Sequence, residues 1–411
     1  KRIGQGWRML MECLADGRSI SLPALSTGGA KMASWSSGAY AAVRKQFKSP
    51  IGKFEGVAEV LGRIAGNSYA MDAARCLTTL AVDSGKKPAV ASAIVKYHLT
   101  ERMRCAVNDA MDIHGGRGIC MGPRNYLARV YQAQPISITV EGANILTRSL
   151  IIFGQGAMRC HPHLLDEIRS AQQRDLVRFD RVLFEHIGLV FSNAVRAVFH
   201  GLSGARFARA PVNRYEARWF RQLTRMSAAF AVTAETALLT LGGTLKRRES
   251  LSARLGDVLS HLYIASAALK RFADQDYQSE DRPLLEWTMR DALYQCQQGL
   301  LEVFANLPVP LVGRLLKWTL FPFGPTYQVP DDALTQRVAA VVLHPGPARD
   351  RLTDGIFVPD NPDEALALLR VAHEKSAAAQ PVLLHLRNAM RNGQLAVGDP
   401  EECLDEALAI G

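Results

Sequence analysis

Long helical segments, each ended by a clear loop, constrain most strongly what this chain can fold into. Apolar residues recur at helical spacing from Ile51 to about Val82, and the loop Asp83-Ser84-Gly85-Lys86-Lys87-Pro88 then stops them. The next periodic stretch ends at Gly115-Gly116-Arg117-Gly118, a strong helix-stop signal. Antiparallel helices joined by short loops form a bundle. The sequence therefore predicts a four-helix up-and-down bundle with helices at about 22–47, 51–82, 89–113 and 145–153.

A second helical set follows the first. Apolar periodicity predicts its helices at about 164–201, 213–247, 250–276 and 282–306. Leu61-Gly62-Arg63-Ile64 in the first set recurs as Leu255-Gly256-Asp257-Val258 in the second, which a duplicated bundle would explain. We therefore expect an all-α fold. Its three parts are 1–22, a loop or strand remnant with a turn at Ala15–Arg18; 23–160, the first bundle; and 164–411, a second helical domain.

The later part of the chain carries weaker signals. Leu311–Trp318, in a region rich in Pro, Phe and Leu, is either a short interfacial helix or a loop packed under the second bundle. The longest apolar stretch, Ala229–Leu245, contains Glu235 and two glycines, which favours a buried helix over a membrane span. Beyond Asp331 we expect short helices and proline-rich turns, with no strand-rich segment.

Charge and cysteine usage narrow the class of protein. The net charge of +10 and the pI near 9.4 suit an anionic partner, such as a nucleotide or a CoA phosphate. Only Lys246-Arg247-Arg248 forms a compact basic run, so a dedicated nucleic-acid-binding role is disfavoured. Seven scattered cysteines without a CxxC pair, and no N-terminal signal, indicate a reducing, cytoplasmic location. His161-Pro162-His163 has no third ligand nearby in sequence, so we expect a linker there and predict no metal site.

One carboxylate, Glu141, stands in an otherwise apolar run from Ile138 to Leu146. Burying an ionised carboxylate without a partner is costly, so such a residue is usually either paired or used in function. Gly142 directly after it permits a backbone turn that other residues resist. A carboxylate near the start of a helix is also favoured by the helix dipole, which is the purely structural explanation.

Two other features accompany this glutamate. Arg44-Lys45-Gln46-Phe47 closes the first long helix, where cations are favourable anyway but where an exposed arginine could also bind a phosphate with two hydrogen bonds. Asp112-Ile113-His114-Gly115-Gly116 follows a helix, which argues against the dinucleotide fingerprint of strand, glycines and helix. The paired glycines fit a helix C-cap and also the close approach of a ligand.

The order of these features resembles the C-terminal helical domain of the acyl-CoA dehydrogenase family, from about Gly17 to Gly156. The stretches VRKQFKSPIGKFEGVAEVLGRIAG, DIHGGRGI and TVEGANILTRSLIIFGQGAMRCHP are most similar to bacterial long-chain fatty-acid β-oxidation members. Residues after about 165 resemble the extra C-terminal domain of those members. Because the family's N-terminal helical domain and middle β-domain are absent, we expect a fragment that does not catalyse alone.

The resemblance implies FAD-dependent conversion of acyl-CoA to trans-2-enoyl-CoA, with Glu141 removing the α-proton of the thioester. Desolvation of such a carboxylate raises its pKa and makes it a stronger base. The resemblance also implies substrate contacts from Arg18 and Gly142. It implies FAD contacts from Arg44, Gln46, Phe54, Glu55, Asp112, Ile113, His114, Gly115, Gly116, Ala143 and Asn144. The chain departs from the family at Glu55 and Asp112, where glutamine is common, and at Ala143-Asn144-Ile145, where Thr-x-Gln is frequent.

The family implies further partners. They are an electron-transfer flavoprotein as electron acceptor and further copies of the chain in a homo-oligomer. If Leu311–Trp318 is an interfacial helix, it would in addition make a peripheral contact with the bacterial inner membrane. Two alternatives remain open at the level of sequence. One is an acyl-CoA oxidase, which shares the fold and the base but lets oxygen reoxidise the flavin. The other is a helical scaffold that has lost the flavin.

Overall fold

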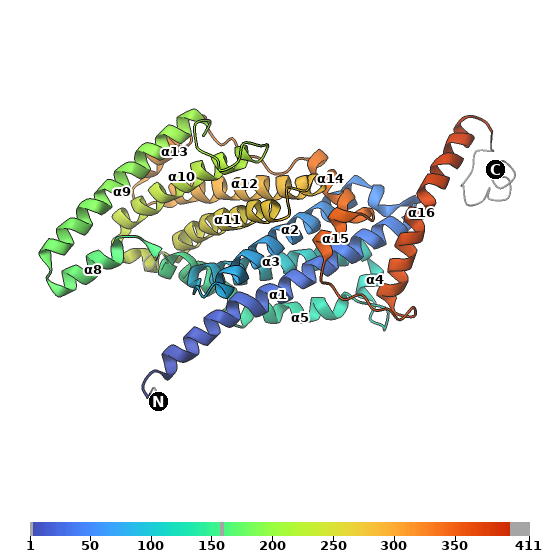
Figure 1. Cartoon of the computed structure of the whole chain (residues 1–411), viewed down its shortest axis with the longest axis horizontal. Helices are drawn as coiled ribbons and strands as arrows, with labels where there is room; N and C mark the ends of the chain where they lie inside the picture. The colour runs from blue at the N-terminus through green and yellow to red at the C-terminus, as the bar shows by residue number, and fades with distance from the viewer. Residues whose placement is uncertain (1–2, 157–159, 395–411) are drawn as a thin grey trace. The chain divides into compact units, whose positions relative to one another are not determined.

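Helices form nearly all of the computed structural model, which describes residues 3–156 and 160–394 (Figure 1). Within these residues the only sheet is a hairpin of two short strands, β1 (Lys45–Gln46) and β2 (Ser49–Pro50). The expected all-α fold is therefore confirmed.

The helices of the first half follow the loop signals closely. The first of them begins at Gly6, where a loop or strand remnant was expected, and ends at Val43, so Arg44 to Phe47 do not close it as expected. They are α1 (Gly6–Val43), α2 (Glu55–Asp83), α3 (Ala89–His114), α4 (Gly116–Ile119), α5 (Ala128–Thr139), α6 (Asn144–Leu146) and the π-helical η2 (Thr147–Gln155), with the 3-10 turn η1 (Ile51–Lys53) after the hairpin.

The turn predicted at Ala15–Arg18 was wrong, because these residues lie inside α1, and Pro23 also lies within the helix. Helix formers such as Met9, Leu10 and Leu14 surround Gly17. A single glycine costs a helix only about 1 kcal/mol, which such neighbours can offset.

The second half contains helices near the positions expected from periodicity, but the single helix expected at about 164–201 was wrong, because the left-handed Arg174 ends one helix and Asp175 caps the next. They are α8 (Leu164–Gln173), α9 (Leu176–Ser203), α10 (Ala217–Leu241), η3 (Gly242–Arg247), α11 (Glu249–Asp274), η4 (Ser279–Asp281), α12 (Arg282–Asn306) and α13 (Pro310–Leu320). Helix α13 confirms a helix, and not a loop, at Leu311–Trp318. The tail forms α14 (Asp332–Leu343), α15 (Pro347–Thr353) and α16 (Ala365–Arg391), the last of which is longer than the short helices expected there.

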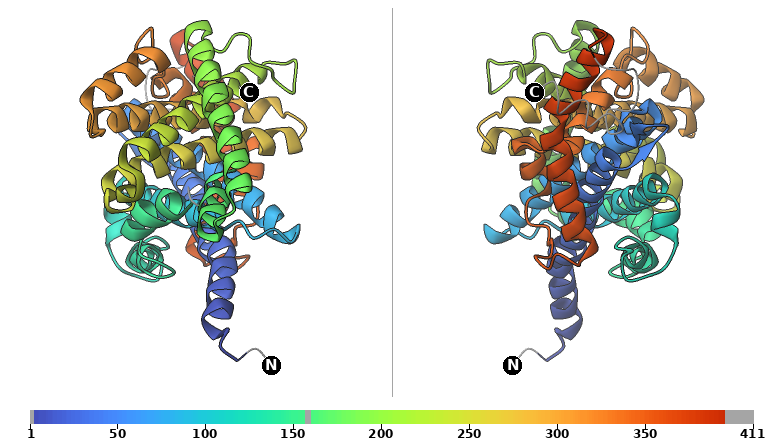
Figure 2. Two further views of the ribbon diagram at one scale, coloured as in Figure 1. Left: turned by 90° about the vertical axis from the view of Figure 1, so that its left-hand side faces the viewer. Right: turned by 90° about the vertical axis from the view of Figure 1, so that its right-hand side faces the viewer.

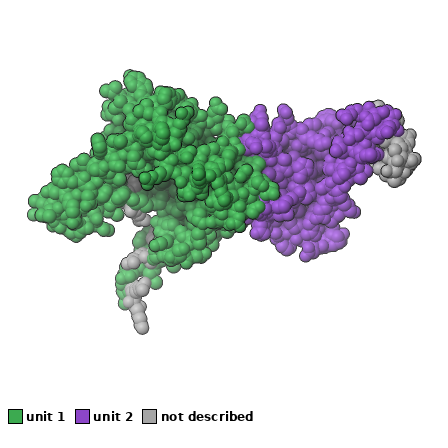
Figure 3. Space-filling view, turned by 45° about the horizontal axis from the view of Figure 1, so that its top comes forward, with its two compact units in different colours: residues 1–27, 69–104, 133–331 green, residues 28–68, 105–132, 332–411 purple. Residues whose placement is uncertain are grey.

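The chain divides into two compact units, which interleave along the sequence (Figure 3). The first comprises 1–27, 69–104 and 133–331, and the second comprises 28–68, 105–132 and 332–411. Each of α1, α2 and α3 contributes one part to each unit.

Helix α11 is the centre of the first unit. It packs against α10, α12 and η2, and its side chains Leu255, Val258 and Phe272 are fully buried. Gly256 lets η2 approach closely, because an added Cβ would lie 3.4 Å from the Arg148 carbonyl oxygen. Helix α9 contacts α8, α10 and α13 and runs along the outer side of this set (Figures 1 and 2).

Small residues explain how the second unit packs. A Cβ added at Gly38 of α1 would lie 2.2 Å from the Val342 carbonyl oxygen, and one at Gly62 of α2 would lie 2.6 Å from that of Thr335. Helix α14 therefore lies directly on the backbones of α1 and α2. The buried Arg349 of α15 donates hydrogen bonds to the carbonyl oxygens of Trp35 and Val342.

Two helical spans are long and apolar enough to cross a membrane by length and composition, namely Leu176–Ser203 and Ala217–Leu245. The pair Ala128–Thr139 and Asn144–Gln155, bent by 47°, would make a third if it is one span. Helix α10, which begins the second span, packs against α9, α11 and α12 and carries the buried Arg225 and Glu235. Helix α9 instead leaves most of its apolar side chains exposed.

Candidate active site around Glu141

Glu141 lies in a tight bend, between the end of α5 at Thr139 and the start of α6 at Asn144. Its φ is +55°, and that of Gly142 is +94°. An L-residue in the left-handed region costs about 1–2 kcal/mol and persists only where its surroundings fix it, often at functional sites. Glu141 lies two residues before Ala143, the N-cap residue of α6.

Arg18 of α1 lies beside this carboxylate. A Cβ added at Gly142 would lie 3.4 Å from Arg18 Nη2, and one at Gly17 would lie 4.0 Å from Glu141 Oε1. Burial lowers the pKa of Arg18, and the charge of Glu141 partly offsets this effect. Among the described residues, the buried Glu141 Oε2 and Arg18 Nε have no hydrogen-bond partner. Glu141 and Arg18 thus lie close together, and each has one buried polar atom that makes no hydrogen bond within the described residues.

Helix α3 holds the residues that follow Glu141. Asn144 Nδ2 donates to Thr100 Oγ1 at 2.9 Å and to Glu101 Oε1 at 2.7 Å, and its Oδ1 accepts from Lys96 Nζ at 2.6 Å. The side chain of Asn144, a predicted FAD contact, is therefore fully hydrogen-bonded inside the protein. Sequence reasoning missed Lys96, although a lone cation among Ile94, Val95 and Leu99 was a detectable signal.

The predicted FAD contacts Arg44, Gln46, Phe54 and Glu55 are exposed in and around the hairpin. Its two turn residues, Phe47 and Lys48, have φ values of +52° and +60°, as a type I′ turn requires. Asn-Gly is the usual pair there, so the turn stores backbone strain. No turn signal in the sequence predicted this hairpin.

The predicted segment from Asp112 to Gly116 joins α3 to α4. The buried His114 ring stacks on Tyr40 with centroids 4.3 Å apart, donates from Nδ1 to the Ala110 carbonyl oxygen and accepts from the Tyr126 hydroxyl. Burial lowers the pKa of His114 to about 4, so the ring is neutral. Asp112, Gly115 and Gly116 remain exposed.

The predicted residues thus form two sets. Glu141, Gly142, Ala143, Asn144 and Arg18 belong to the first unit, and the structure brings Arg18 and the bend together. The second set, in the second unit, comprises Arg44, Gln46, Phe54, Glu55 and Asp112 to Gly116.

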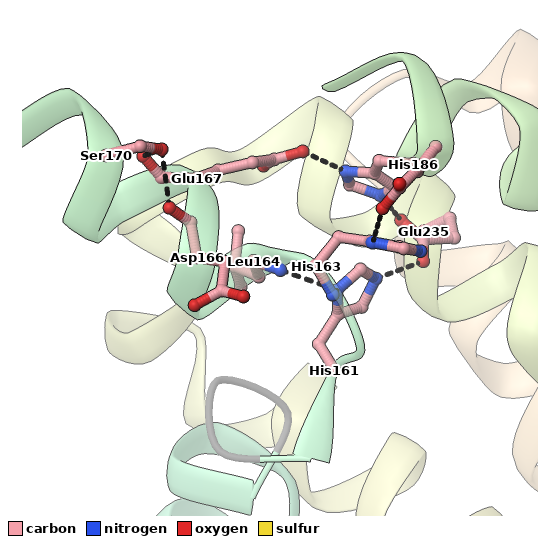
Figure 4. Close-up of polar contacts among 9 residues, drawn as sticks. His161, His163, Leu164, Asp166, Glu167, Ser170, His186 and Glu235 are labelled. Carbon is pink, nitrogen blue, oxygen red and sulfur yellow. Dashed lines mark hydrogen bonds and ion pairs between the residues drawn. The ribbon is translucent and has the colours of Figure 1, made fainter. Parts of the chain in front are cut away.

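A second polar cluster joins α8, α9 and α10 (Figure 4). His161 Nε2 contacts Glu235 Oε1 at 2.7 Å, while His186 contacts Glu235 Oε2 at 3.2 Å and Glu167 Oε1 at 2.7 Å. The expected linker at His161-Pro162-His163 therefore reaches residues that are remote in sequence. Burial alone would lower the pKa of His186, but its hydrogen bonds to the two carboxylates raise it.

Three of these side chains, His161, His186 and Glu235, place possible metal-ligand atoms within 4.8 Å of one another. However, the backbone N–H groups of His163 and Leu164 donate to His161 Nδ1. The ring proton therefore lies on Nε2, where it is donated to Glu235. A metal-bound histidine normally donates a proton from its other nitrogen, so this arrangement is a hydrogen-bonded network.

Helices α9, α10 and α11 enclose a cavity of about 740 Å³ next to that network. Its lining is mostly apolar and includes Phe153, Leu189, Phe230 and Leu262. No predicted site residue lines this cavity, so it is separate from the bend that carries Glu141.

Two family models together match most of the chain. The model of the acyl-CoA dehydrogenase C-terminal domain matches residues 4–154, and that of the bacterial-type acyl-CoA dehydrogenase C-terminal domain matches residues 158–411. The chain belongs to the acyl-CoA dehydrogenase family.

Two relatives each match part of the chain. A probable acyl-CoA dehydrogenase, FadE10 of Mycobacterium tuberculosis, is 35% identical over 118 residues, which is 28% of this chain and 18% of that protein. The acryloyl-CoA reductase (NADH) of Anaerotignum propionicum is 32% identical over 152 residues, or 36% of this chain and 37% of that one. The chain thus matches less than two-fifths of the length of these relatives.

Solved structures share the fold at low identity. An acyl-CoA dehydrogenase complexed with FAD from Bacillus anthracis superimposes with a TM-score of 0.65 at 19% identity, covering 83% of this chain and 57% of that one. Acyl-CoA oxidase-1 of Caenorhabditis elegans, complexed with FAD and ATP, gives 0.51 at 13% identity, covering 97% and 57%.

The His186 network predicts a pH-dependent stability. Because folding raises the pKa of His186 above its unfolded value of about 6.5, the stabilisation is complete below that pH and is lost as pH rises through the folded pKa. We expect urea unfolding to show His186→Gln destabilised by roughly 1 kcal/mol at pH 5.5 and by much less at pH 8.5. An equal loss at both pH values would contradict a charged His186.

The geometry of the bend predicts that one methyl group added at Gly142 destabilises the fold. Gly142→Ala would place a Cβ 3.3 Å from Thr147 Oγ1 at a φ of +94°, so we expect a loss of roughly 1–3 kcal/mol of stability. Gly188→Ala in α9 is the matched control, because its Cβ would meet no atom within 4 Å. Thermal unfolding of both variants measures the difference, and equal midpoints would show that the bend tolerates a side chain.

Proposed function

We propose that this chain carries the catalytic base of an FAD-dependent acyl-CoA dehydrogenase, and that Glu141 is that base. The proposed reaction converts long-chain acyl-CoA to trans-2-enoyl-CoA, the first step of fatty-acid β-oxidation. The observation that carries the proposal is the carboxylate of Glu141, which a strained backbone holds beside Arg18 with a buried oxygen left unpaired.

Proton removal is the step that falls to this chain. Glu141 Oε2 is the proposed acceptor of the α-proton, because hydrogen bonds within the described residues do not engage it. A general base must lie within hydrogen-bond reach of its proton, and the fixed bend restricts where the carboxylate can go. The positive charge of Arg18 beside the carboxylate would help to hold it in place before substrate enters.

The second set of residues fits a flavin dinucleotide. Arg44 offers an exposed guanidinium, and Gly115 and Gly116 offer an exposed backbone turn without side chains, both suited to phosphate oxygens. Phe54 offers an exposed ring for an aromatic group. When bound, FAD would accept the hydride that leaves the β-carbon.

An acyl-CoA oxidase remains the second candidate, because oxidases of known structure share this fold. The two activities differ in how the reduced flavin meets oxygen. Slow reoxidation in air favours the dehydrogenase, whereas rapid peroxide formation favours the oxidase. A colourless full-length protein that takes up no added FAD would instead favour a scaffold.

We further propose an electron-transfer flavoprotein as electron acceptor, self-association, and a cytoplasmic location with peripheral contact to the inner membrane. The support for membrane contact is α13, where Leu311, Leu315 and Trp318 are exposed beside the exposed Arg314 and Lys317. Such a pattern is typical of interfacial helices that bind anionic lipid surfaces.

Replacing the base tests the proposal most directly. In the complete natural polypeptide loaded with FAD, Glu141→Gln should keep the flavin but lower kcat by roughly 100-fold to 10,000-fold, because the amide cannot accept the proton. Turnover of long-chain acyl-CoA with an artificial electron acceptor measures the loss.

An exposed glutamate of α16 provides the control for this substitution. Glu374→Gln makes the same chemical change on the surface and should retain wild-type turnover. Retained activity in Glu141→Gln would remove Glu141 from the mechanism.

The membrane contact has its own test. Trp318→Glu should reduce co-sedimentation with vesicles that contain anionic lipid, because it places a negative charge in the apolar face of α13. Leu384→Glu makes a similar change at an exposed apolar residue of α16 and serves as control. Equal binding by the two variants would leave α13 as a packing helix.

A further inference from the structure

A buried lysine is the least expected residue near the bend. Lys96 of α3 is 0% exposed, whereas lysine is almost never fully buried unless it is paired. Burying an ammonium group is costly, and replacing a buried charge by an apolar side chain is often neutral or stabilising. The residue therefore needs an explanation other than the stability of the fold.

Both observed hydrogen bonds of this ammonium go to the segment after Glu141. Lys96 Nζ donates to the Gly142 carbonyl oxygen at 2.6 Å and to Asn144 Oδ1 at 2.6 Å. The Gly142 carbonyl oxygen also accepts from Thr147 Oγ1 at 3.2 Å. The Gly142–Ala143 peptide, one peptide bond beyond the glutamate, is thus held by two donors.

Other residues of α3 also hold the segment that follows Glu141. Thr100 Oγ1 and Glu101 Oε1 accept the two amide protons of Asn144, and Gln134 of α5 donates to the Thr100 carbonyl oxygen at 3.3 Å. These contacts fix where the bend leaves α5 and enters α6. The left-handed φ of Glu141, which is unfavourable by itself, therefore has external support.

We propose that Lys96 is a positioning residue for the proposed reaction, whose ammonium group holds the Glu141–Asn144 bend so that the glutamate carboxylate stays aimed beside Arg18. This inference rests on the proposed function of Glu141. Lys96 acts through the bend and does not itself touch the reacting atoms.

The charges around Lys96 give this role a pH dependence. Burial and the charge of Arg18 of α1 together lower the pKa of Lys96 to about 8, although Glu141 in the bend and Glu101 of α3 oppose the decrease. Because folding depresses this pKa, deprotonation above pH 8 does not reduce the stability of the whole fold. It removes only the charge that strengthens the hydrogen bonds to the bend. As pH rises, the bend should therefore loosen while the stability of the whole fold does not decrease.

The first experiment compares two lysine-to-methionine variants of the complete, FAD-loaded polypeptide. Lys96→Met should lower at least tenfold the hydrogen-exchange protection of the amides that begin η2, the first of which, at Thr147, donates to the Ala143 carbonyl oxygen. It should also lower kcat on the order of 100-fold, as expected for a misplaced catalytic group, and change KM by less than about threefold. Lys270→Met, in the exposed ion pair of α11, should behave as wild type. Unchanged protection, or unchanged kcat, in Lys96→Met would overturn the proposal.

The second experiment measures hydrogen exchange in the wild type first, so its main result does not depend on whether a variant folds. Protection of the same amides in the wild type, corrected for intrinsic exchange, should fall between pH 7 and pH 9.5, and Lys96→Arg should delay that fall because arginine stays charged. Constant wild-type protection over this range would overturn the proposal. Hydrogen exchange tests the role of Lys96 without measuring turnover. Retained turnover in Glu141→Gln would instead refute the proposed function of Glu141 and would leave the exchange result unaffected.

Discussion

The candidate site depends on one constraint, the left-handed backbone conformation of Glu141, which a glutamate does not adopt without support from its surroundings. Glu141 and Gly142 both have positive φ, and the bend would relax if the neighbouring helices did not hold it. Helix α1 supplies Arg18 on one side, and α3 supplies Lys96, Thr100 and Glu101 on the other. The cost of strain and of a buried cation is offset by the remaining packing of the unit, which is how proteins commonly accommodate preorganised sites.

The sequence predicts the helices well because their ends carry strong local signals. Loops such as Asp83–Pro88 and the glycines after His114 stop a helix in almost any context. Glu141 was predictable for a related reason, since a lone charge in an apolar run conflicts with its surroundings. The turn at Ala15–Arg18 failed because one glycine is weaker than the helix formers around it.

Hydrogen-bond partners that lie far apart in the sequence could not be predicted from local patterns. Lys96 and Asn144 are 48 positions apart, and His161 and Glu235 are 74 apart, so no short window could pair them. The Phe47-Lys48 turn escaped prediction because its residues contradict the preferences of a type I′ hairpin. The repeated Leu-Gly pattern is informative in hindsight. Gly62 and Gly256 each allow a neighbouring backbone to approach closely. The residue after each glycine forms a salt bridge: Arg63 pairs with Asp109, and Asp257 pairs with Arg148.

The exposed face of α9 has a practical consequence for anyone who purifies this polypeptide. Phe184, Phe191 and Leu202 are exposed on a helix whose most apolar window is only 11% buried. Soluble monomers rarely show contiguous apolar patches beyond a few hundred Å². Melting temperatures and sedimentation profiles should therefore vary with protein concentration, because a second copy that covers this face binds the native state in preference to the unfolded one.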